Sequence, residues 1–182
     1  MSTALIVIDV QESFRVGDSW AEASAPDIAD RVATLVDHAR AEGQEVVWIL
    51  HSEAGSGTPF DPASGQVRLM DGLTPWAGEP LLYKTSHNAF TTTNLAQQLT
   101  SRGVTDVVIC GIRTEQCCET TARLASDLGY RVRFVLDATV TMPLPLWDGT
   151  GTISAEDVLA RTASALQGRF ADVVMVEDVL AS

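Results

Sequence analysis

Short, uninterrupted apolar runs recur along the chain and alternate with segments of helical periodicity. An apolar run without polar alternation predicts a strand buried on both faces, which is typical of a parallel sheet covered by helices. Such runs occupy residues 3–10 and 45–50, and further strands are predicted over residues 106–110, 131–137 and 172–176. Helical spacing marks residues 26–43, 91–101, 117–128 and 154–166. This alternation predicts an α/β, three-layer, doubly wound fold with a central, mostly parallel sheet of five to six strands and helices on both faces.

The composition narrows the class of protein. With 182 residues and no shift of composition, we expect one domain over residues 1–182. A net charge of −12 argues against a nucleic-acid partner. The N-terminal residues lack a basic signal-peptide region, and no apolar run approaches the roughly 20 residues of a membrane helix. Three cysteines crowded into one stretch suit a reduced protein, so we predict a cytoplasmic protein without a membrane partner.

Two segments are rich in loop-forming residues. Residues 54–83 contain many Gly, Pro, Ser and Asp, and we expect a long excursion with little regular structure that lines a site. Residues 138–152 are also expected to form a loop. From these segments and the end of the first run we take four side chains as candidate walls of a substrate pocket: Phe14, Trp76, Leu146 and Trp147.

Polar residues follow several of the predicted strands. Asp9, His51 and the turn after Cys110 all fall at strand ends, and ligands of parallel sheets bind beyond the carboxyl ends of the strands. Residues 9–14 read Asp-Val-Gln-Glu-Ser-Phe, without a glycine-rich phosphate fingerprint. A dinucleotide-binding fold is therefore disfavoured.

Three side-chain types suggest one reaction centre. Lys84 is the only lysine among twelve basic residues. A carboxylate such as Asp9 can take a proton from a thiol and return it to a leaving amine, and an ammonium nearby favours the ionised forms of both. A thiol at the head of a helix is also expected to be biased towards thiolate. Helical spacing does not choose between Cys117 and Cys118 as that thiol.

The turn that contains these cysteines resembles a known motif. Residues 111–117 read Gly-Ile-Arg-Thr-Glu-Gln-Cys and are similar to the G-x-x-T-x-x-C nucleophile turn of the isochorismatase-like cysteine hydrolases, which include nicotinamidases and N-carbamoylsarcosine amidohydrolase. Residues 5–14 resemble the first-strand motif of this family, which carries a catalytic aspartate. Residues 84–90 resemble its lysine motif K-x-x-x-S-A-F, with Asn88 at the serine position. The three motifs occur in the order of the family and span residues 5–123, so the resemblance covers most of the chain.

The resemblance implies roles for individual residues. It makes Cys117 the nucleophile, Asp9 the general acid/base and Lys84 an electrostatic partner. It implies a cis peptide bond between Ile112 and Arg113, with the backbone N–H groups of Arg113 and Cys117 directed at a developing oxyanion. The reaction would be attack on an amide carbonyl, loss of amine or ammonia, and hydrolysis of a thioester, without a cofactor. It also implies a homodimer or a higher homo-oligomer.

Two departures from the family pattern limit the substrate. Nicotinamidases bind a metal through D-x-H after the second strand, where this chain has His51-Ser52-Glu53. We therefore predict no metal here and a structural, hydrogen-bonding His51. Arg113 occupies a position that is often small in the family. Its guanidinium is expected either to bind a substrate carboxylate or to pair with Glu115, and the sequence leaves both open.

Two other functions are compatible with parts of the pattern. An isochorismatase that splits a vinyl ether keeps the aspartate and lysine but needs no cysteine, so Cys117 counts against it. A non-catalytic scaffold that keeps only the fold has no need of Asp9, Lys84 and Cys117 together. We therefore predict a cysteine hydrolase acting on a C–N bond of a small molecule.

Overall fold

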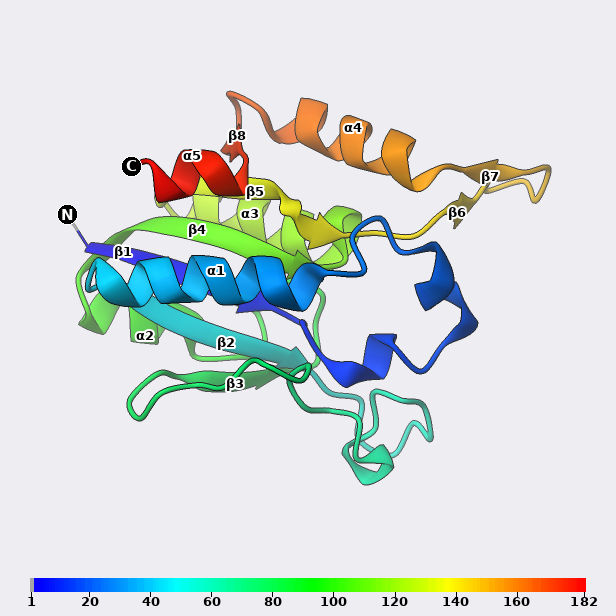
Figure 1. Ribbon diagram of the computed structural model, residues 1–182, viewed down its shortest axis with the longest axis horizontal. Helices are drawn as coiled ribbons and strands as arrows, with labels where there is room; N and C mark the ends of the chain where they lie inside the picture. Colours follow the sequence, from blue (N-terminus) through cyan, green and yellow to red (C-terminus); the bar gives the residue numbers. More distant parts are fainter. Residues whose placement is uncertain (1) are drawn as a thin grey trace.

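A six-stranded parallel sheet forms the centre of the computed structural model, which describes residues 2–182 (Figure 1). The strand order is β3-β2-β1-β4-β5-β8, and every neighbouring pair runs parallel. The strands are β1 (Ser2–Ile8), β2 (Glu45–His51), β3 (Leu81–Lys84), β4 (Val104–Ile112), β5 (Arg131–Val140) and β8 (Asp172–Val174). The predicted α/β fold with a mostly parallel sheet and helices on both faces is thus confirmed.

Helices cover the two faces of the sheet and bury a core on each. One face packs against α1 (Ile28–Ala41) and α5 (Val176–Leu180). The other packs against α2 (Leu95–Ser101), α3 (Glu119–Asp127) and α4 (Ala155–Leu166). Side chains of β1 alternate between the two cores, which is why its sequence is apolar without interruption.

The irregular segments contain more structure than the sequence predicts. Strand β3 lies at the end of the segment expected to be irregular, and it was missed because it is a half-exposed edge strand. The predicted loop 138–152 contains the end of β5 and most of an antiparallel hairpin of β6 (Leu144–Pro145) and β7 (Thr152–Ile153), which extends away from the sheet in Figure 1. The last strand ends at Val174, two residues before the predicted end, because α5 begins at Val176. Short turns of helix span Glu12–Phe14, Asp18–Glu22, Pro62–Ser64 and, in π-helical form, Thr114–Cys118.

The central strands place their carboxyl ends side by side. In the β1–β4 register Ile8 lies opposite Gly111, and in the β2–β3 register His51 lies opposite Lys84. Gly111 has φ of 133°, and a Cβ atom there would meet the Ile8 carbonyl oxygen at 1.9 Å. Only glycine therefore allows β4 to approach β1 at this point. Among the residues from 2 to 182, no helix has the length and apolar character needed to cross a membrane.

Candidate active site

Three side chains from distant segments meet at the carboxyl edge of the sheet. Asp9 follows β1, Lys84 ends β3, and Cys117 lies in the π-helical turn after β4. The Lys84 Nζ atom lies 2.7 Å from Asp9 Oδ2 and donates a hydrogen bond to Cys117 Sγ at 3.3 Å. The side chains of Asp9 and Lys84 are completely buried. The structure thus brings together the carboxylate, ammonium and thiol that the sequence singled out.

The backbone around Asp9 is held in an unusual conformation. Asp9 has φ of 54°, the only positive φ of a non-glycine residue in the described chain, and such residues concentrate at functional sites. Its N–H donates to the Ile49 carbonyl at 2.8 Å. Beside it, the buried Gln11 side chain donates to the His51 carbonyl and accepts from the His51 N–H. These bonds fix the end of β1 against the end of β2.

The protonation of the Asp9–Lys84 pair follows from burial and mutual attraction. Burial raises the pKa of the Asp9 carboxyl, although Lys84 and Cys117 partly offset this effect. Burial lowers the pKa of Lys84, but attraction to Asp9 and Cys117 outweighs it and leaves this pKa above its ordinary value. Lys84 therefore keeps its proton, and Asp9 is a stronger base than an exposed carboxylate.

The Cys117 thiol is less acidic than the sequence suggests. Burial, followed by the negative charge of Asp9, raises its pKa to about 12, and the ammonium of Lys84 offsets only part of this. The expected bias towards thiolate is therefore wrong, because the thiol lies deep beside a carboxylate. A thiol that keeps its proton needs a base at the moment of attack, and Asp9 is in place for that role.

The structure distinguishes the two adjacent cysteines, which helical spacing could not. Cys117 lines a pocket and receives the Lys84 hydrogen bond. Cys118 is fully buried in the core between the sheet and its helices, and burial also raises its pKa well above the ordinary value. Of the two, Cys117 is the one placed to meet a ligand.

Hydrogen bonds from neighbouring elements hold the turn that carries Cys117. The peptide bond between Ile112 and Arg113 is cis. The Thr121 hydroxyl donates to the Cys117 carbonyl at 2.6 Å and accepts from the Ala89 N–H at 3.0 Å. This pair of bonds connects the cysteine turn to the segment that follows Lys84.

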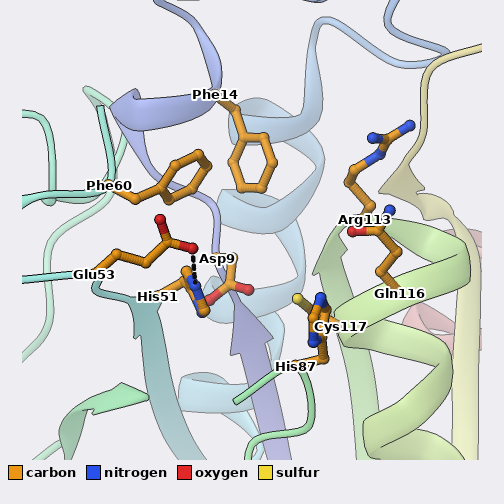
Figure 2. A pocket seen from close by; sticks show the side chains of 9 residues that line it. All are labelled: Asp9, Phe14, His51, Glu53, Phe60, His87, Arg113, Gln116 and Cys117. Carbon is orange, nitrogen blue, oxygen red and sulfur yellow. Dashed lines mark hydrogen bonds and ion pairs between the residues drawn. The ribbon is translucent and has the colours of Figure 1, made fainter. Parts of the chain in front are cut away.

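The pocket beside the reactive groups has a volume of about 230 Å³ (Figure 2). Its lining residues beyond the cluster are two aromatic rings, three polar residues near β2 and β3, and two residues of the cysteine turn: Phe14, Phe60, His51, Glu53, His87, Arg113 and Gln116. Phe14 is the one predicted wall residue among them. Phe60, Glu53, His87 and Gln116 were not predicted as lining residues, because a loop sequence does not show which way the loop folds.

Three expected pocket walls lie elsewhere, and this corrects the prediction. The Trp76 ring is covered by the Arg40 guanidinium at 4.2 Å, away from the pocket. Trp147 is 96% exposed on the β6–β7 hairpin, and Leu146 belongs to the same hairpin, where its N–H donates to Gly151. Apolar loop residues resemble pocket walls in a sequence, but here Trp76 packs against Arg40 and the other two residues lie in a locally paired hairpin.

Arg113 pairs within the chain. Its Nε atom lies 3.2 Å from Glu115 Oε1, and its Nη2 atom donates to the Met142 carbonyl at 3.4 Å. The other Glu115 oxygen accepts from the Thr141 hydroxyl at 2.7 Å. Of the two alternatives left open by the sequence, the structure shows the pair with Glu115.

His51 extends the cluster to the pocket surface. Its Nδ1 atom lies 3.2 Å from Lys84 Nζ, and its Nε2 atom lies 3.0 Å from Glu53 Oε1 (Figure 2 shows the second contact). In residues 2–182 no three His, Cys, Asp or Glu side chains are arranged to hold a metal ion. The absence of a bound metal stays a prediction from the sequence.

Comparisons with known proteins agree on one group of enzymes. Residues 3–178 match the Isochorismatase domain. The chain is 31% identical to the uncharacterized isochorismatase family protein YddQ of Bacillus subtilis over 99% of each chain, and 32% identical to nicotinamidase 3 of Arabidopsis thaliana over 81% of this chain and 77% of that one. The crystal structure of a cysteine hydrolase from Pseudomonas syringae superposes with a TM-score of 0.88 at 26% identity, covering 98% of this chain and 91% of the other.

Proposed function

Because the chain belongs to the isochorismatase family and is a hydrolase, we propose that it cleaves a C–N bond of amide type in a small molecule, with Cys117 as the nucleophile. One observation carries the proposal. A single ammonium, Lys84 Nζ, lies within 3.3 Å of both a buried carboxylate and a thiol that faces a small pocket. A carboxylate next to a protonated thiol is the arrangement that general-base activation of a nucleophile requires.

The first half of the reaction forms a thioester. Asp9 takes the thiol proton as Cys117 Sγ attacks the amide carbonyl carbon, and the carbonyl oxygen becomes an oxyanion. The backbone N–H groups of Arg113 and Cys117 are the proposed donors to this oxyanion. Asp9 then gives its proton to the nitrogen, the C–N bond breaks, and ammonia or an amine leaves.

The second half regenerates the enzyme. Asp9 accepts a proton from a water molecule that attacks the thioester carbonyl, the C–S bond breaks, and the thiol regains its proton. Lys84 stays protonated throughout and stabilises whichever of its two neighbours is ionised. This role agrees with the raised pKa of Lys84. Burial lowers that pKa, but attraction to Asp9 and Cys117 outweighs burial.

The relatives support the same class of bond. A nicotinamidase is by its name an amidase, and another relative is named as a ureidoacrylate amidohydrolase. No observation favours vinyl-ether cleavage, since that reaction leaves the Cys117 contact with Lys84 without a purpose. A single domain over residues 1–182, a cytoplasmic location and a homo-oligomer remain predictions from the sequence.

An ammonia-release screen tests the proposal. Small amides, carbamoyl compounds and isochorismate are incubated with the wild type, with Cys117→Ser, and with the matched control Cys110→Ser. We expect ammonia from at least one amide or carbamoyl compound, a loss of at least about 10³-fold in Cys117→Ser, and near-normal rates in Cys110→Ser, whose sulfur lies outside the pocket. Turnover that survives Cys117→Ser, or turnover of isochorismate alone, would contradict the proposal.

A further inference from the structure

The charges around the pocket do not cancel. Asp9 is paired with Lys84, and Arg113 is paired with Glu115, so each of these pairs contributes no net charge. Glu53 remains. Its one ion-pair contact within the described chain is with His51, and no lysine or arginine side chain lies within 4.0 Å of its carboxylate.

The geometry indicates that His51 is neutral. The Lys84 ammonium has only hydrogen-bond donors, so the His51 Nδ1 atom 3.2 Å away must accept. The ring proton is then on Nε2, which donates to Glu53 at 3.0 Å. A protonated imidazole would direct an N–H group at the ammonium. His51 therefore orients the Glu53 carboxylate without neutralising it, and the pocket keeps one negative charge.

The surroundings of Glu53 also suit a cation. Its side chain is 46% exposed, and within residues 2–182 the second carboxylate oxygen accepts one hydrogen bond, from the Thr58 hydroxyl at 3.4 Å. The Glu53 N–H donates to the Phe60 carbonyl at 2.8 Å, which joins their backbones, and both side chains line the pocket. The Phe14 and Phe60 rings pack edge to face at 4.9 Å on the same wall (Figure 2). Aromatic faces and a carboxylate are the two groups that attract ammonium and guanidinium ions.

We propose that the pocket selects small amides that carry a positive charge, and that Glu53 is the residue that recognises this charge. The inference rests on the proposed amide hydrolysis. The negative charge of Glu53 disfavours an anionic substrate. In addition, the Arg113 guanidinium, which could bind an anion, is already paired with Glu115.

Charged thiol reagents test the selectivity without requiring turnover. Cys117 is treated at about pH 8 with cationic aminoethyl, neutral methyl and anionic sulfonatoethyl methanethiosulfonate, and its modification is followed by peptide mass spectrometry. Each rate is divided by the rate of the same reagent with free cysteine. We expect the corrected cationic rate to exceed the anionic rate by at least about tenfold, and Glu53→Gln to reduce this ratio by roughly tenfold.

Glu42→Gln is the matched control, because it removes one exposed carboxylate at the opposite edge of the sheet. It measures the contribution of the overall negative charge, and we expect it to change the ratio by less than twofold. Equal changes in Glu53→Gln and Glu42→Gln would overturn the inference. So would a corrected anionic rate equal to the cationic rate in the wild type.

Turnover separates this inference from the proposed function. The isosteric pair 4-aminobutanamide and pentanamide differ in charge and are assayed for ammonia release. Hydrolysis with preference for the cationic amide supports both proposals, and hydrolysis without that preference overturns the charge selectivity alone. Charge-selective modification of Cys117 in a protein that hydrolyses no amide would support the selectivity and overturn the proposed function.

Discussion

Two carboxylate–cation contacts of nearly equal length lie in different parts of the molecule. Asp9 and Lys84 approach to 2.7 Å with both side chains fully buried. Glu119 and Arg161 approach to 2.6 Å, but 63% of the Arg161 side chain is exposed. Distance alone therefore says nothing about what each contact does.

Their surroundings differ more than their lengths. The Glu119 carboxylate also accepts two bonds from Arg123 and one from Thr162, so it joins α3 to α4 with all its oxygens occupied. Asp9 has one ion-pair partner, Lys84, within the described chain. A buried pair with few further hydrogen bonds does not recover its desolvation cost, so stability does not explain it. This contrast supports the proposed catalytic role of the Asp9 cluster, whereas the Glu119 cluster joins α3 to α4.

The largest expected effect is on turnover. Asp9→Asn removes the base while it preserves the shape of the side chain, and we expect kcat/KM to fall by up to about 10⁴-fold. Glu119→Gln, the same change in the other cluster, is expected to change kcat/KM by less than threefold. Ammonia release at several substrate concentrations measures both. A variant Asp9→Asn that keeps more than a tenth of the activity would remove Asp9 from the mechanism.

The next effect is on the free energy of unfolding. Lys84→Met leaves the Asp9 charge buried without a partner, and we expect a loss of about 3–5 kcal/mol in denaturant unfolding. The double variant Asp9→Asn/Lys84→Met removes both charges and should recover most of that loss. If the double variant is no more stable than Lys84→Met, the pair is not a coupled unit and the comparison fails.

The two strands next to the site show what the sequence can predict. Strand β1 was predictable because both of its faces are buried, whereas β3, which carries Lys84, is a short edge strand with mixed polarity. Asp9, Lys84 and a cysteine could be grouped from their residue types, whereas the choice of Cys117 over Cys118 depended on the resemblance to the family.

Glu53 and Phe60 could not be predicted as pocket residues. Their loop is placed by long-range bonds, such as those from Glu12 N–H to Arg68 and from Met70 N–H to Val10. The sequence also did not show how deeply Cys117 is buried. This is why the thiol of Cys117 was expected to be acidic, although burial raises its pKa to about 12.

The pH dependence of Cys117 ionisation follows from its surroundings. A raised pKa keeps the proton on sulfur to higher pH, so at about pH 9, where a free thiol is half ionised, Cys117 should show almost no thiolate. Asp9→Asn removes one cause of the raised pKa while Lys84 remains, and we expect roughly tenfold more thiolate at a given pH. The ultraviolet absorbance of thiolate, taken as the difference between each protein and its Cys117→Ser counterpart, measures this. Appreciable thiolate at about pH 8 in the wild type would contradict it.

The smallest effect is expected in the exposed half of the Glu119 cluster. Arg161→Ala removes an ion pair whose cationic side chain is largely in solvent, while Arg123 still donates twice to Glu119. Exposed pairs contribute little because water and salt screen them, so the free energy of unfolding should fall by no more than about 1 kcal/mol. Added salt should reduce this difference further, whereas it should leave the loss in Lys84→Met nearly unchanged, because that pair is shielded from solvent. Denaturant unfolding of both variants at low and high salt provides the measurement. Equal salt dependence in the two variants would mean that burial does not separate the clusters after all.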